Sequence, residues 1–324
     1  MIPSVSYRSA RLAAGAFFMA ALLGGCASMV PQTMGLRHAW PEGVAVRTEI
    51  AEVPFFPQED YQCGPAALAT SLVHVGVKVT PEDLVKQVYI PERQGSLQAE
   101  MLATPRQYGR VAYQLEPRFA DLVREVAAGH PVIILQDIGL GIFTKWHYAV
   151  VVGYDYPAGE LYLRSGEKKR EAMPFTMLEY TWKKSNYWAM LALPPGELPT
   201  TATEATYLPA VAAMERVADK RATLQAYAAA LERWPDSLGA SVGLANQQHA
   251  LGNLKDAEAV LRRAAARHPD SVVVLNNLAQ TLSDEGHHAE ALSLIDRAKP
   301  EPPLAASVEQ TRALILERLA KAKK

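Results

Sequence analysis

Apolar and polar residues between positions 50 and 194 follow patterns that change between helical and extended periods. After Cys63, apolar residues recur at helical spacing as far as Gly76, which predicts a mostly buried helix. Thr80-Pro81-Glu82-Asp83 has the N-cap residue and the acidic first turn that begin a second helix. Further helices are expected over 96–108 and 119–128, and strands over 111–115, 132–135, 147–154, 160–164 and 187–193. This mixture predicts an α+β domain over residues 50–194.

The last third of the chain has an internal period of 34 residues. Trp234-Pro235-Asp236-Ser237 recurs as His268-Pro269-Asp270-Ser271, and small residues such as Gly252 and Gly286 recur at the same spacing. A 34-residue period with small residues at helix crossings is the signature of tetratricopeptide repeats, which stack pairs of helices. We therefore expect a linker over 195–206 and an all-helical repeat domain over 207–324, with a generic helical bundle as the alternative.

The first 25 residues differ from the rest. Arg8 and Arg11 precede a short uncharged apolar run that ends at Gly25, as in a secretory signal peptide. The alternative is an N-terminal membrane anchor, although the run is shorter than the ~20 residues that a spanning helix needs. Leu23-Gly24-Gly25-Cys26 resembles a bacterial lipoprotein box, which implies cleavage before Cys26 and lipidation of that cysteine. Residues 26–49 then read as a tether, and the resemblance implies an outer-membrane lipoprotein facing the periplasm.

Composition narrows the function classes. The chain has 324 residues, enough for about two domains, and its formal net charge of −1 gives no general electrostatic case for nucleic-acid binding. We expect no metal, because His287 and His288 are adjacent and point to different faces of a helix. No Gly-rich phosphate loop follows a strand either, so no cofactor is expected. If Cys26 carries lipid, Cys63 is an unpaired thiol in an exported protein, which marks it as a candidate reactive residue.

The surroundings of Cys63 favour a nucleophile. Pro65 suits the first turn of a helix, so Cys63 lies at or just before a helix N-terminus. The free N–H groups and the helix dipole at that position predict a stabilised thiolate and a lowered thiol pKa. The alternative is a buried structural cysteine, but the neighbours Gln62 and Gly64 are poor core residues.

A thiol nucleophile needs a base, and His147 is the best placed of the eight histidines. It begins the predicted strand His147-Tyr148-Ala149-Val150-Val151-Val152, whereas His74 lies near the far end of the Cys63 helix and four others lie in the repeat region. A histidine at the start of a strand that faces a cysteine-bearing helix is the arrangement that thiol hydrolases use.

Cys63-Gly64-Pro65-Ala66-Ala67-Leu68, with the later His-Tyr-x-Val-Val-x-Gly-Tyr strand, resembles the bacteriocin-processing cysteine peptidases. These are papain-like enzymes whose best-known members cleave after a double glycine in leader peptides. The resemblance covers about residues 50–194 and implies an α+β papain-like cysteine peptidase domain, followed here by the all-α tetratricopeptide-repeat domain. It also implies that Cys63 is the nucleophile, His147 the general base and Gln58 the oxyanion-hole side chain.

The sequence departs from this family pattern at two places. Gln58 lies five residues before Cys63, where the family usually has six. The Asp or Asn that orients the histidine is replaced by Leu163-Arg164-Ser165-Gly166, in which Ser165 is the candidate third member. Asp155 lies in the intervening turn and is expected to be too far along the strand.

We therefore expect an exported, lipid-anchored cysteine peptidase that acts on a peptide or protein. Its repeats would recruit that substrate or a protein partner, and the lipid would attach it to the membrane. Amide hydrolysis or acyl transfer on small peptides is a second possibility. A catalytically weak or inactive module that serves as an envelope assembly or scaffold protein is a third. A Ser165 hydroxyl within hydrogen-bond reach of His147 would favour an enzyme.

Overall fold

The computed structural model describes residues 30–58, 62–140 and 143–322. The predicted signal peptide and the candidate lipidation site Cys26 lie outside this part of the chain. The described chain divides into two compact units, one of residues 30–101 and 114–191 and one of residues 102–113 and 192–322. The sequence placed the domain boundary at 194 and did not anticipate that 102–113 groups with the second unit.

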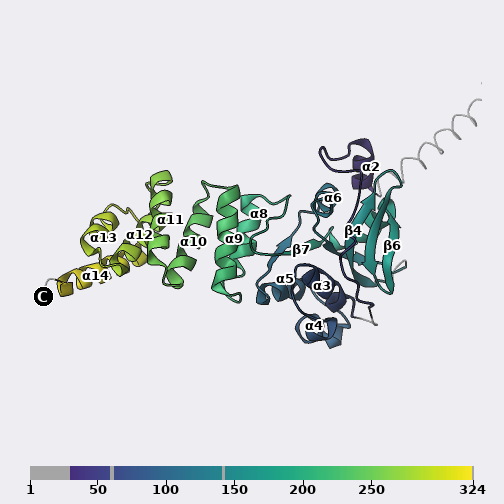
Figure 1. Ribbon diagram of the computed structural model, residues 1–324, viewed down its shortest axis with the longest axis horizontal. Helices are drawn as coiled ribbons and strands as arrows, with labels where there is room; N and C mark the ends of the chain where they lie inside the picture. The colour runs from purple at the N-terminus through teal and green to yellow at the C-terminus, as the bar shows by residue number, and fades with distance from the viewer. Residues whose placement is uncertain (1–29, 59–61, 141–142, 323–324) are drawn as a thin grey trace, which may run out of the picture. The chain divides into compact units, whose positions relative to one another are not determined.

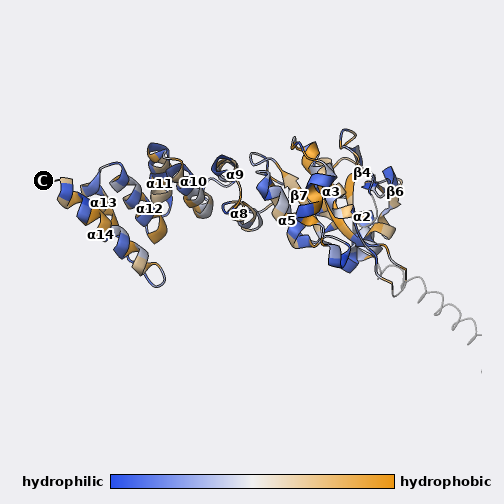
Figure 2. Ribbon diagram, turned by 90° about the horizontal axis from the view of Figure 1, so that it is seen from below, coloured by the Kyte–Doolittle hydropathy of each residue, from blue (hydrophilic) through white to orange (hydrophobic). Residues whose placement is uncertain are grey.

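A seven-stranded antiparallel sheet forms the core of the first part of the chain (Figure 1). Its main strand order is β2-β7-β3-β4-β5-β6, and β1 pairs with the end of β4. The strands are β1 Arg47–Glu49, β2 Val111–Gln114, β3 Val132–Asp137, β4 Trp146–Asp155, β5 Glu160–Ser165, β6 Lys168–Pro174 and β7 Ala189–Leu193. Every residue of β3 and β7 is buried. β7 is a continuous apolar run, whereas β3 ends in the buried polar residues Gln136 and Asp137. Figure 2 shows the hydrophobic colour concentrated on these central strands.

Short helices cover both faces of this sheet. They are α2 Pro31–His38, α3 Cys63–His74, α4 Pro81–Val88, α5 Gln98–Gln107, α6 Phe119–Ala127 and α7 Phe175–Trp182, with 3₁₀ turns at Pro91–Arg93 and Lys183–Ser185. Helix α3 packs against β4, and α6 packs against β4 from the other side (Figure 1). The predicted start of α4 is confirmed, because Thr80 and Asp83 form a reciprocal capping box.

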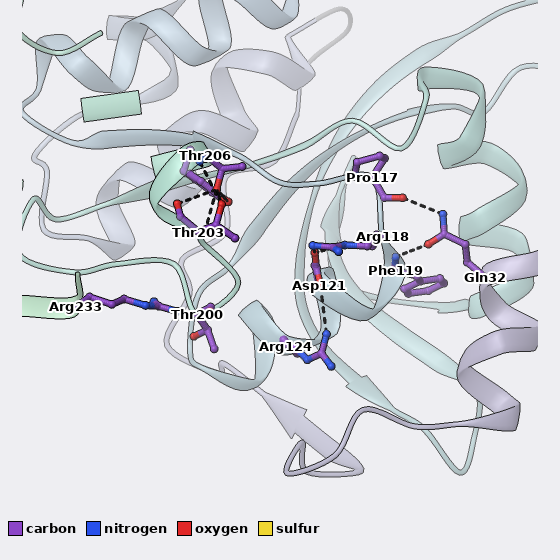
Figure 3. A network of polar contacts seen from close by, with 11 residues as sticks. Gln32, Pro117, Arg118, Phe119, Asp121, Arg124, Thr200, Thr203, Thr206 and Arg233 are labelled. Carbon is purple, nitrogen blue, oxygen red and sulfur yellow. Dashed lines mark hydrogen bonds and ion pairs between the residues drawn. The ribbon is translucent and has the colours of Figure 1, made fainter. Parts of the chain in front are cut away.

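The predicted tether over 26–49 is wrong for residues 30–49, which are part of the folded domain. The buried carboxylate of Glu179 accepts the N–H groups of Gln32 and Thr33 at 2.9 and 2.6 Å, at the start of α2. The Gln32 side chain also bridges the Pro117 carbonyl and the Phe119 N–H (Figure 3). Strand β1 then pairs with β4. The proline and glycine residues of this segment suggested a tether. Residues 30–49 are instead held by long-range hydrogen bonds, which the local sequence pattern does not report.

Strand β6 and helix α7 were not predicted. The strand begins with the charged run Lys168-Lys169-Arg170-Glu171 and lies at the sheet edge, where most of its side chains are exposed. Such a strand lacks the apolar alternation that signals a half-buried strand. This omission affects the candidate site, because β6 contributes side chains to it.

The last part of the chain consists of paired helices with the predicted 34-residue period. They are α8 Glu204–Ala212, α9 Lys220–Arg233, α10 Leu238–Ala250, α11 Leu254–Arg267, α12 Val272–Asp284, α13 His288–Ile295 and α14 Ala305–Ala322. Small residues allow the helices to approach closely: a Cβ added at Gly243 would lie 2.4 Å from the Tyr227 ring. No helix in the described part of the chain has the length and hydropathy needed to cross a membrane.

Candidate active site

Cys63 is the first residue of α3. The backbone N–H groups of Tyr148, Gly64 and Cys63 itself and the positive charge of Lys145 all act to lower the pKa of its thiol. Burial nevertheless raises the pKa of the Cys63 thiol above its ordinary value, because desolvation of the thiolate outweighs these contributions. The expected lowering of the thiol pKa is therefore wrong for the free protein. The thiol needs a base to become a nucleophile near neutral pH.

His147 lies near the start of β4, one residue before Tyr148, whose backbone acts to lower the pKa of the Cys63 thiol. Its Nε2 is 3.0 Å from the hydroxyl oxygen of Ser165 on β5, which is 7 % exposed. Burial lowers the pKa of His147 to about 4, while the carboxylate of Glu171 acts to raise it and Lys145 acts to lower it. The imidazole is therefore neutral at pH 7 and can accept a proton.

The tip of the β5–β6 hairpin holds both Ser165, which contacts His147, and the carbonyl that binds the backbone of Gln58. Ser165 pairs with Lys168 across the turn, where Gly166 has a φ of +57°, a left-handed conformation that favours glycine. The carbonyl of Gly166 accepts the backbone N–H of Gln58 at 3.1 Å. One tight turn thus positions both Ser165 and Gln58.

The Gln58 amide points into the same region. Its Nε2 donates to the Tyr148 carbonyl at a long 3.4 Å and retains a second hydrogen. Its buried Oε1 has no hydrogen-bond partner among the described residues. Upstream, the buried guanidinium of Arg164 donates to the carbonyl of Val53 at 3.2 and 3.3 Å, which holds the approach to Gln58 against the sheet.

Asp137, which the sequence analysis did not single out, holds the connection that leads into β4. Its carboxylate accepts the N–H groups of Gly139 and Lys145 at 2.9 and 2.8 Å, and Lys184 Nζ lies 3.1 Å away. Burial opposes ionisation, but these donors hold the pKa of Asp137 below its ordinary value. Because Lys145 directly precedes Trp146, the first residue of β4, its contact with Asp137 positions the start of the strand that carries His147.

A cleft of about 1480 Å³ brings the predicted residues together. Gln58, Cys63, His147 and Ser165 all line it, and so do Glu171 of β6 and Lys145, which the sequence analysis missed. Asp155 does not take part: it lies at the far end of β4, paired with Arg47 at 2.8 Å. Among the described residues there is no group of three or more His, Cys, Asp or Glu side chains arranged to hold a metal ion.

Comparison with known proteins agrees with this architecture. Residues 50–190 match the Peptidase_C39 like family, and residues 220–273 and 248–315 match the tetratricopeptide repeat. The chain therefore has a C39-like peptidase α+β domain followed by an all-helical tetratricopeptide-repeat region. The predicted fold class is confirmed.

Two solved structures are similar to the first domain. One is a C39-like peptidase from Bacillus anthracis, with 17% identity and a TM-score of 0.38, covering 45% of this chain and 97% of that one. The other is a double glycine motif protease from an AMS/PCAT transporter in complex with the leader peptide, with 21% identity and a TM-score of 0.34, covering 44% and 93%.

One curated protein shares a shorter stretch. Over 66 residues this chain is 41% identical to cellulose synthase operon protein C of Pseudomonas fluorescens (strain SBW25). The match covers 20% of this chain and 5% of that protein, so the chain spans only a small fraction of that relative's length.

Proposed function

We propose that the first domain is a cysteine peptidase in which Cys63 is the nucleophile and His147 the general base. The observation that carries this proposal is the contact between His147 Nε2 and Ser165 Oγ in the cleft that Cys63 also lines. A hydrogen bond at Nε2 leaves Nδ1 as the ring nitrogen available to the thiol. This is the division of roles that a base held by a third residue requires.

The reaction follows from these positions. His147 takes the proton of the Cys63 thiol as Sγ attacks the carbonyl carbon of a peptide bond. The oxyanion that forms accepts hydrogen bonds from the Cys63 N–H and from the free hydrogen of Gln58 Nε2, each worth roughly 3–4 kcal/mol in such sites. The imidazolium then protonates the leaving amine, and water hydrolyses the thioester with His147 again acting as base.

Other parts of the chain would bring this domain to its substrate. The repeats support recruitment of a protein substrate or partner, because such helices present a shared concave surface rather than chemistry of their own. The box that ends at Cys26 supports export and lipid attachment at the outer membrane, with the domain facing the periplasm. Since residues 30–49 are folded, only a few residues would separate the lipid from the domain.

An inactive peptidase-like module that acts as an assembly or scaffold protein is the second candidate. The raised pKa of the Cys63 thiol favours it.

Alkylation of Cys63 by iodoacetamide separates the two candidates. We would use a chain that begins at residue 27, so that Cys63 is its only cysteine. The peptidase proposal predicts that His147→Ala lowers the rate at pH 7 by about 100-fold, the lower end of general-base contributions. His74→Ala, which alters the other end of α3, should leave the rate unchanged. Equal rates in wild type and His147→Ala would support the inactive module.

A further inference from the structure

The residue that contacts His147 in the candidate site is the neutral Ser165, whereas a cysteine peptidase benefits from a negative charge next to its histidine. Ser165 contacts the imidazole, but its hydroxyl cannot stabilise the positive charge that His147 acquires as strongly as a carboxylate can. Two carboxylates line the same cleft, those of Glu167 and Glu171. Glu167 lies in the exposed hairpin turn, whereas the Glu171 side chain is only 23% exposed.

The β5–β6 register places Glu171 on the same face of the sheet as Ser165, the residue that contacts the histidine. Leu163 pairs with Glu171 and Ser165 pairs with Lys168, so β6 has one more residue than β5 between the two pairs. This bulge brings Lys168 and Glu171 to the same face as Ser165, where in a regular strand they would lie on opposite faces. The 2.9 Å ion pair between Lys168 Nζ and Glu171 Oε1 agrees with that placement.

We propose that Glu171 is a positioning residue that acts electrostatically on His147 from β6, the strand that pairs with the strand of Ser165, supplying the negative charge that Ser165 lacks. Lys168 moderates this effect as its counter-charge. The inference rests on the proposed function only in assigning a catalytic purpose to the coupling, since the coupling itself is a property of the folded protein.

The other charges of the cleft determine in which direction the pKa of His147 should change when Glu171 is neutralised. Burial disfavours the imidazolium, the charge of Glu171 favours it, and Lys145 from the loop before β4 disfavours it. Arg93 and Lys168 also line the cleft and oppose a second positive charge, while Glu167 lies in the solvent-exposed turn and Cys63 is neutral until it loses its proton. Glu171 is therefore the carboxylate that keeps the pKa of a buried imidazole from falling further.

Three variants test this coupling. Glu171→Gln removes the charge and keeps the shape, and Glu167→Gln makes the same change in the exposed turn as a matched control. Lys168→Met removes the counter-charge. All three positions lie in the edge strand or its turn and carry exposed or half-exposed side chains, so the fold is expected to tolerate the changes.

The primary readout is the titration of the His147 ring, followed by NMR on histidine-labelled protein and assigned by comparison with His147→Ala. Glu171→Gln should lower the pKa of His147 by roughly half a unit to one unit, Lys168→Met should raise it, and Glu167→Gln should leave it in place. Circular dichroism at each pH confirms that the protein is folded. The alkylation rate of Cys63 at pH 7 should fall in Glu171→Gln alone.

The outcomes distinguish the inference from the proposed function. Equal shifts in Glu171→Gln and Glu167→Gln, or no shift in either, would overturn the role of Glu171 whatever the peptidase activity. A selective shift of the His147 titration supports the coupling even if His147→Ala leaves alkylation unchanged, a result that would refute the peptidase alone.

Discussion

Replacement of His147 by glutamine is expected to remove a large part of the acid sensitivity of the first domain. The folded pKa of His147 is about 4, against an ordinary value of 6.5. The unfolded chain therefore binds more protons at this residue as the pH falls from about 6.5 to about 4, and folding stability decreases over that window. This difference of 2.5 pKa units corresponds to about 3 kcal/mol in the free energy of unfolding. About 2.5 kcal/mol of it is lost by pH 4.5.

Urea unfolding at pH 7.5 and pH 4.5, followed by tryptophan fluorescence, measures this term. Trp40, Trp146, Trp182 and Trp188 all lie in the first unit, so a Trp234→Phe background confines the signal to it. In that background, the free energy of unfolding of the protein that keeps His147 should fall by about 2.5 kcal/mol more between pH 7.5 and pH 4.5 than that of the His147→Gln variant. Parallel losses in the two proteins, within about 0.5 kcal/mol, would refute the reasoning that burial lowers the pKa of His147.

Four further substitutions test other parts of the structure. Gln58→Ala should lower kcat for peptide hydrolysis by roughly 10²–10³-fold; an effect on KM alone would contradict its place in the oxyanion hole. Ser165→Ala should lower kcat/KM by only about three- to tenfold, as expected for loss of one neutral hydrogen bond. Glu179→Ala should cost about 3 kcal/mol in urea unfolding of the first domain, because two N–H groups of α2 lose a buried carboxylate acceptor. Gly243→Ala should destabilise the repeat region by about 1–3 kcal/mol by thermal unfolding, through overlap with Tyr227.

The sequence predicted the elements whose signals are local. The helix that begins at Cys63 was found from apolar periodicity and a proline in its first turn, and β4, which begins one residue before His147, was found from its β-branched run. The repeat helices were found from their period, which needs no knowledge of tertiary contacts. Ser165 was selected by its place at the end of the strand after His147, and the structure puts it 3.0 Å from the ring.

What the sequence did not predict depends on long-range contacts. Helix α2 and strand β1 are fixed by Glu179, more than 140 residues away, and by pairing with β4. Glu171 was missed because a charged edge strand gives no apolar alternation, and Asp137 because its partners are two backbone N–H groups and the distant Lys184. The predicted shift of the Cys63 thiol pKa was wrong in direction. Burial raises this pKa by more than the backbone N–H groups at the start of the helix lower it, and no local sequence pattern reports burial.

The most direct measurement of the central claim is acyl transfer through Cys63, followed by mass spectrometry with p-nitrophenyl acetate on the chain that begins at residue 27. A catalytic Cys63–His147 pair predicts an S-acetyl adduct on Cys63 that forms and then disappears as water hydrolyses the thioester, with continued release of p-nitrophenol. Cys63→Ala should give neither the adduct nor turnover, and His147→Ala should slow both steps. An adduct on Cys63 that accumulates without turnover, at the same rate in wild type and His147→Ala, would contradict a catalytic pair.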